Sequence, residues 1–101
     1  MATLHLVSAS QETSAALSNC LHAASPGDSV VLIGNGVFNA NSPIFRAVLP
    51  AQEAAIVFWY ALADDITARG IGSHVDSAIT LVDDFAFVDL VAAHQPIVSW
   101  S

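Results

Sequence analysis

The stretch Ala-Ala-Ile-Val-Phe-Trp-Tyr-Ala-Leu-Ala, from Ala54 to Ala63, decides the fold that we expect for this chain. No charged residue interrupts it, and its middle five residues are β-branched or aromatic, the types that favour strands. Its ten residues are too few to cross a bilayer, which takes about 18 or more. Because the apolar residues are continuous, we expect a strand covered on both faces, as in a parallel sheet between helices.

Strand and helix patterns alternate on either side of this stretch. We expect further strands at residues 3–8, 29–33, 78–82 and 97–100, and helices at residues 11–24, 44–49, about 64–69 and about 84–94. This alternation, with short loops, predicts right-handed crossovers. We therefore expect a single α/β domain over residues 1–101, with a mostly parallel five-stranded sheet and helices on both faces, flavodoxin-like or a close variant.

Polar residues stand where these helices are expected to begin and end. Ser10 is a candidate cap for the first helix, and Gly70 suits the left-handed position after the third. The acidic pairs at 64–65 and 83–84 could serve as paired carboxylates for acid and base chemistry. Each pair follows a strand and precedes a helix, where a carboxylate accepts backbone N–H bonds, so we favour helix caps.

The composition indicates an oligomer that does not bind nucleic acid by itself. Apolar residue types make up 54% of the chain and charged residues 11%, against about 25% charged in an average domain. Part of the surface must then be apolar, which is typical of an interface. With no lysine, only Arg46 and Arg69, and a net charge of −7, the chain should repel phosphate backbones and favour a basic partner.

The first seven residues contain neither a basic segment nor a long apolar core, so we expect no signal peptide or membrane anchor and a cytoplasmic protein. A single cysteine, Cys20, cannot form an intrachain disulfide. The four histidines, His5, His22, His74 and His94, show no metal-ligand spacing, and one cysteine cannot complete a zinc set. We therefore expect no metal site.

Two features could carry chemistry. Gly34-Asn35-Gly36 follows a strand, where open parallel sheets bind ligands, but Asn39 replaces the third small residue of a dinucleotide motif, so we favour a tight turn over a ligand site. Cys20 lies on an apolar helix stripe with Ala16, Leu17, Leu21 and Ala24. From the residues alone we favour a buried core thiol, and only exposure at an interface would make it a persulfide carrier.

Short motifs along nearly the whole chain resemble the DsrH/TusB family, the small subunit of sulfur-relay complexes. No single motif is diagnostic, but their order and spacing together are fairly specific. The family pattern differs at Gln11, where a proline is usual, at Asn35, and over residues 39–55. The motifs that match are Leu4-His5 with Ser10, Ala24-Ser25-Pro26-Gly27-Asp28, Gly36-Val37-Phe38, Tyr60-Ala61-Leu62 with Asp65, Ala68-Arg69-Gly70, Leu81-Val82-Asp83, Phe87-Val88-Asp89-Leu90, His94 and Trp100.

The resemblance implies a persulfide-relay heterohexamer with two copies each of this subunit, a DsrE/TusD-like subunit and a DsrF/TusC-like subunit, which exchanges sulfur with small sulfur-carrier proteins. The DsrE/TusD-like subunit would carry the principal cysteine, and Cys20 would be a secondary persulfide carrier. Persulfide exchange requires no metal or organic cofactor. Cys20 matches a cysteine typical of the DsrH branch in sulfur oxidation, which favours that branch over TusB-like tRNA 2-thiolation. The alternatives are a purely structural subunit and a small nucleotide-binding domain.

Overall fold

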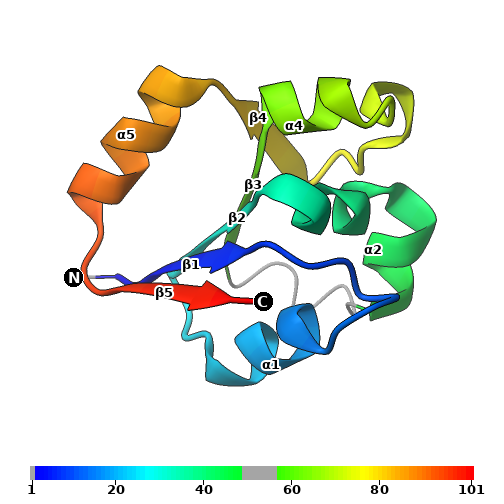
Figure 1. Cartoon of the computed structure of the whole chain (residues 1–101). Helices are drawn as coiled ribbons and strands as arrows, with labels where there is room; N and C mark the ends of the chain where they lie inside the picture. The colour runs from blue at the N-terminus through cyan, green and yellow to red at the C-terminus, as the bar shows by residue number, and fades with distance from the viewer. Residues whose placement is uncertain (1, 49–56) are drawn as a thin grey trace.

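A computed structural model of the chain, which describes residues 2–48 and 57–101, contains one five-stranded sheet (Figure 1). All its strand pairs are parallel, and the strand order is β4-β3-β2-β1-β5. The order differs from the flavodoxin order, 2-1-3-4-5. The strands are β1 (Leu4–Val7), β2 (Ser29–Leu32), β3 (Phe58–Leu62), β4 (Ile79–Val82) and β5 (Ile97–Trp100). The predicted α/β class and five-stranded parallel sheet are confirmed.

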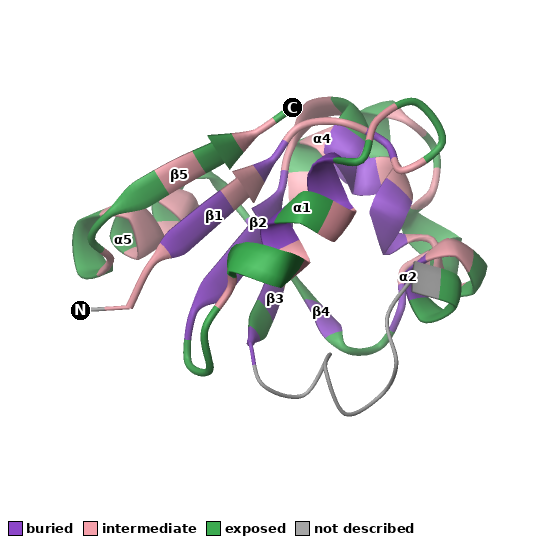
Figure 2. Cartoon of the chain, turned by 90° about the horizontal axis from the view of Figure 1, so that it is seen from below, coloured by how far each residue is buried: buried purple, intermediate pink, exposed green. Residues whose placement is uncertain are grey.

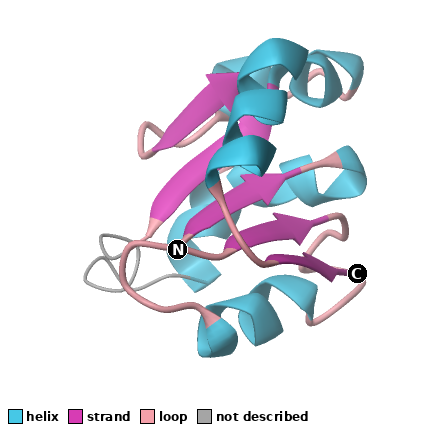
Figure 3. Cartoon of the chain, turned by 90° about the vertical axis from the view of Figure 1, so that its left-hand side faces the viewer, coloured by secondary structure: helices cyan, strands magenta, loops and turns pink. Residues whose placement is uncertain are grey.

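The helices are unequally divided between the two faces of the sheet. They are α1 (Ala16–Ala23), the 3-10 helix η1 (Gly34–Ala40), α2 (Ser42–Val48), α4 (Ala63–Ala68), the 3-10 helix η2 (Gly72–His74) and α5 (Asp84–Ala93). The chain steps from β1 to β4 in one direction and then returns past β1 to β5, so right-handed crossovers place α5 opposite the preceding helices. Figure 3 shows α5 crossing in front of the strands. In the described part of the chain, no helix is long and apolar enough to span a membrane.

The main core lies between the sheet and α1, η1, α2 and α4. Trp59 and Ala61 of β3 point into it, and the ring of Trp59 meets Phe45 of α2 edge to face at 5.1 Å between centroids. Side chains alternate along a strand, so Phe58 lies on the other face, where it is 59% exposed. Complete cover on both faces of this strand was a wrong expectation for the described part of the chain, in which α5 is the one helix on the second face.

The bounds of the central strand and of the first helix differ most from the predicted ones, while the second helix begins two residues early, at Ser42. Residues 54–56 of the expected central strand lie outside the described residues, and Ala63 already begins α4. The first helix begins at Ala16 instead of residue 11, and the hydroxyl of Ser14, not that of Ser10, accepts its first backbone N–H at 3.1 Å. The reason is that Asn39, which is fully buried, accepts the N–H of Gln11 at 2.8 Å and donates to the carbonyl of Ala9 at 2.9 Å. These two bonds hold the segment after β1 outside the helix.

The predicted caps are partly confirmed. Asp83 caps α5 by accepting the N–H of Ala86 at 2.8 Å, and Gly70 is left-handed with φ 66°. The cap predicted for Asp64 or Asp65 is wrong, because Leu62 is the N-cap of α4 and both acids lie in its first turn. Asp65 instead accepts the N–H of Gly34 at 2.8 Å, so it joins α4 to the start of η1.

Candidate functional site

Cys20 lies on the core-facing side of α1, with its side chain fully buried. Ala16 and Leu17 of the same stripe are also buried, as their spacing predicts. Burial, together with the negative charge of nearby Asp28, raises the pKa of the Cys20 thiol to about 12. A thiol must ionise and be reachable to attack a persulfide. In this fold Cys20 therefore has the environment of a core residue.

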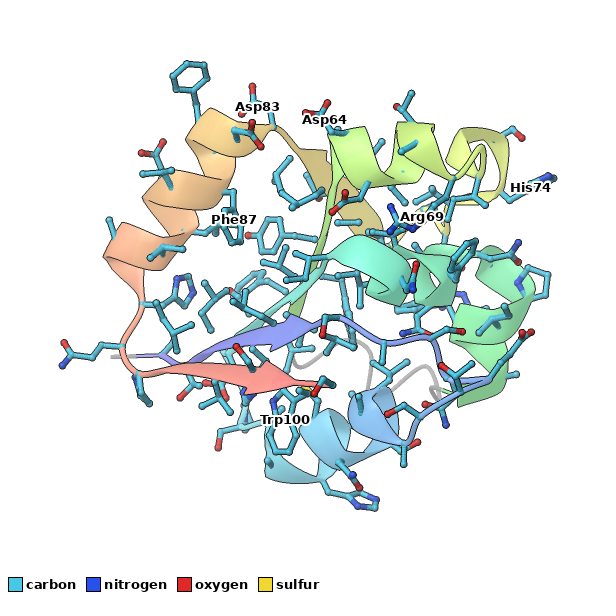
Figure 4. The ribbon with its side chains drawn as sticks, in the orientation of Figure 1. Asp64, Arg69, His74, Asp83, Phe87 and Trp100 are labelled. Atoms are coloured by element: carbon cyan, nitrogen blue, oxygen red, sulfur yellow. The ribbon has the colours of Figure 1, made fainter. Side chains whose placement is uncertain are left out.

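Three side chains form a hydrogen-bonded cluster, which we call the His5 cluster: His5 of β1, Asp28 in the turn after α1, and Trp100 of β5, which is half-buried. Trp100 donates its indole N–H to His5 Nδ1 at 3.1 Å. An indole can only donate, so the proton of the imidazole is on Nε2, which donates to Asp28 Oδ2 at 3.0 Å. His5 and Asp28 are 3% and 6% exposed. In Figure 4, Trp100 extends from β5 toward α1.

Asp28 is the acceptor that holds this cluster together. Besides His5, it accepts the backbone N–H of Thr3 at 3.0 Å and of Ser25 at 2.9 Å. Burial would raise the pKa of Asp28, but the hydrogen bonds from Ser25, His5 and Thr3 outweigh it and hold the pKa below its usual value. Asp28 therefore remains ionised and joins β1, the turn after α1 and, through His5, the last strand.

Gly34-Asn35-Gly36, which form the first turn of η1, pack tightly against β1. Gly34 has φ 52°, and a Cβ atom at Gly36 would stand 2.0 Å from the carbonyl oxygen of Val7. Glycine is therefore required at residue 36 by close backbone approach, which agrees with the favoured prediction of a tight turn. A hollow of about 250 Å³ lies beside this turn, lined by Ser10, Glu12, Thr13, Asn35 and Phe38. Glu12 is the charged residue of this lining, and its carboxylate would repel a phosphate group.

Substitution of Gly36 by alanine is expected to destabilise the fold by about 2 to 3 kcal/mol, because β1 must move to admit the methyl group. Urea unfolding of the purified variant measures this loss. Gly72→Ala is the matched control, since a Cβ atom there meets only Ile66 Cγ2 at 3.9 Å, an ordinary contact. If both variants unfolded at the same urea concentration as the parent chain, the close approach of Gly36 to Val7 would be wrong.

The histidines do not converge on a metal. Among the described residues no group of three or more His, Cys, Asp or Glu side chains could hold an ion. His94 follows α5, and its ring nitrogens hydrogen-bond to the carbonyl of Leu90 and the hydroxyl of Ser29. His22 lies in the last turn of α1, while His74 lies at the surface beyond α4 (Figure 4).

Sequence patterns alone did not reveal the His5 cluster or the role of Asn39. His5, Asp28 and Trp100 lie far apart in the chain, and they meet because β1 pairs with both β2 and β5. Their one signal was their place among the motifs that resemble DsrH/TusB. Asn39 interrupts a glycine motif and gave no signal that its amide would bind the backbone beside Ala9.

Comparison with known proteins identifies the family. The model of the DsrH family, described as DsrH like protein, matches residues 9–97. The chain belongs to the DsrH family. It is 32% identical to Protein TusB of Pectobacterium parmentieri over 99 residues, which cover 96% of this chain and 99% of that protein. It is also 35% identical to Protein TusB of Cronobacter sakazakii over 75 residues, or 73% of this chain and 76% of that protein. The resemblance to the DsrH/TusB family is thus confirmed.

Two solved structures share the fold of this DsrH-family chain. Protein Tm0979 from Thermotoga maritima, solved by NMR, has a TM-score of 0.65 and 26% identity, with 92% of this chain and 94% of that chain covered. BT1422 from Bacteroides thetaiotaomicron, a conserved protein of unknown function, has a TM-score of 0.67 and 14% identity, with 96% and 93% covered. The second likeness shows the fold alone.

Proposed function

We propose that this chain is a supporting subunit of a cytoplasmic persulfide-relay heterohexamer, acting as DsrH does in sulfur oxidation or as TusB does in 2-thiolation of the tRNA wobble uridine. Its partners are a DsrE/TusD-like and a DsrF/TusC-like subunit, and small carrier proteins bring and remove sulfur. The family match over residues 9–97 carries this proposal, because it spans almost the whole chain. Family membership supports a role in sulfur relay.

The environment of Cys20 favours a supporting role over a catalytic one. In a relay step a thiolate attacks the outer sulfur of a donor persulfide, a new S–S bond forms, and the donor leaves as a thiolate, with no net oxidation or reduction. Cys20 is fully buried, and burial raises its pKa to about 12, so almost none of it is thiolate at neutral pH. We therefore assign the principal sulfur transfer to the DsrE/TusD-like neighbour.

Persulfide loading of the assembled complex tests this assignment. After incubation with a persulfide donor, we expect the DsrE/TusD-like subunit to gain about 32 Da and this subunit to gain nothing, because only an accessible thiolate reacts. Alkylation of Cys20 should be slow until denaturant is added. Cys20→Ser should destabilise the chain by about 1 to 3 kcal/mol, since the buried hydroxyl replaces a thiol in an apolar site.

The opposite results would make Cys20 the secondary carrier that the family resemblance implies. That outcome consists of a mass gain on this subunit that Cys20→Ser abolishes while the complex still assembles. Cys20→Ala is the matched control, because it removes the thiol without burying a hydroxyl. Failure of every subunit to gain sulfur would contradict the sulfur-relay proposal itself.

A further inference from the structure

Helix α5 is apolar on all sides but covered on only one. Eight of its ten residues, Asp-Phe-Ala-Phe-Val-Asp-Leu-Val-Ala-Ala, are apolar, yet none of the ten is buried. Phe87 points from α5 toward the sheet in Figure 4, and Leu90 and Val91 are half-buried on the same side. Figure 2 shows the contrast with the buried strands β1 and β2.

The outward side of α5 carries a stripe that we call the Phe85 stripe, made of Phe85, Val88 and Ala92. These residues are three and four positions apart, so they share one side of the helix. Phe85 is 84% exposed and Val88 63%, and Ala92 is exposed as well. A helix that is apolar all round is normally buried all round. In the described part of the chain no residue buries this stripe, which leaves it open to cover by another molecule.

The charges around the stripe are all acidic. Asp89 borders it, Asp84 and the cap Asp83 stand at its amino end, and Figure 4 shows Asp64 of α4 beside Asp83. The two arginines of the chain are elsewhere: Arg46 pairs with Asp76, and Arg69 bonds to Asn35 of η1. Pairing of two copies of this chain through α5 would bring these carboxylates together, and an anionic membrane would meet the same repulsion.

We propose that the Phe85 stripe is a docking surface for a different protein chain, which presents an apolar patch bordered by Arg or Lys side chains. Phe85 is its aromatic anchor, and Asp84 and Asp89 select the basic border. A standard interface buries about 800 Å² per partner, about 15% of the 5208 Å² surface of this chain, so the contact would extend beyond α5. This inference rests on the proposed function in taking the other relay subunits as the partner.

Co-purification of this chain with the DsrE/TusD-like and DsrF/TusC-like subunits of its own host tests the proposal. The double variant Phe85→Ser, Val88→Ser should weaken assembly by at least about 30-fold, because it removes the anchor. Asp89→Lys should weaken it by about tenfold and reduce its dependence on salt. Glu12→Lys is the matched control: it makes the same charge change at an exposed residue after β1, and its affinity should stay within about twofold.

Circular dichroism should show that all three variants fold, since the replaced side chains are exposed. If the complex forms and the double variant binds as well as the parent chain, the docking surface is wrong and the proposed function stands. If the chain alone forms dimers that Phe85→Ser dissociates, a second copy occupies the stripe and the proposal is overturned. Binding to anionic lipid vesicles that the double variant loses would also overturn it. If no complex forms even with the parent chain, the proposed function is wrong, and so is the assignment of the relay subunits as the partner.

Discussion

Replacement of Trp59 by alanine is expected to lower the free energy of unfolding by about 3 to 5 kcal/mol, because a large side chain leaves a cavity in a packed core. Trp59 of β3 is 4% exposed and packs edge to face on Phe45 at 5.1 Å between ring centroids. Urea unfolding at a fixed protein concentration measures the loss. Any loss of sulfur transfer should follow from the loss of folded protein.

The preceding residue provides the control. Phe58 belongs to the same strand but is 59% exposed, so Phe58→Ala should change the stability of the chain by less than about 1 kcal/mol. A Trp59→Ala chain that stayed as stable as the parent, with only sulfur transfer lost, would show that β3 is not the core strand.

Replacement of Asp28 by alanine is expected to cost about 3 to 5 kcal/mol, because it leaves buried N–H groups without an acceptor. Three donors lose their partner: the backbone N–H groups of Thr3 and Ser25, and Nε2 of His5. The loss should also weaken the hold on β5, since Trp100 reaches Asp28 through His5. Urea unfolding and hydrogen exchange of the β5 amides measure the two effects.

A change at an exposed acid is the matched control for Asp28. Asp64→Ala removes the same charge at the surface and should stay within about 0.5 kcal/mol of the parent chain. The stability of Asp28→Asn should lie between those of Asp28→Ala and Asp64→Ala. Asparagine keeps one acceptor oxygen, but its NH2 group then faces an N–H donor. Equal stability of Asp28→Ala and Asp64→Ala would contradict the His5 cluster.

The stability should also depend on pH through Asp28. Its folded pKa lies below the usual value because the hydrogen bonds outweigh burial, so its stabilising effect is complete above the unfolded pKa of about 3.9. As the pH falls through the folded pKa, the carboxylate takes up a proton and the effect is lost. Asp76, which is buried and paired with Arg46, also has a lowered pKa and should behave in the same way. The free energy of unfolding of Asp28→Ala should therefore fall less steeply with decreasing pH than that of the parent chain.

Local patterns in the sequence were enough to predict all five strands and the fold class. Continuous apolar runs and glycine turns act between neighbours in the chain, and so they are visible without a structure. The same holds for the cap at Asp83, the left-handed Gly70 and the apolar stripe of α1. The late start of α1 was not visible, because the side chain of Asn39 holds the segment after β1 from a distant part of the chain.

The sequence by itself therefore determined the class, the order of elements, the family and the scarcity of positive charge. Only the tertiary structure decided the strand order and the meeting of His5, Asp28 and Trp100, because both depend on which strands pair. It also decided which apolar residues remain uncovered. The apolar sequences of β3 and α5 indicate which side chains would be buried. The number of helices on each face of the sheet decides how many of those side chains the chain itself can cover.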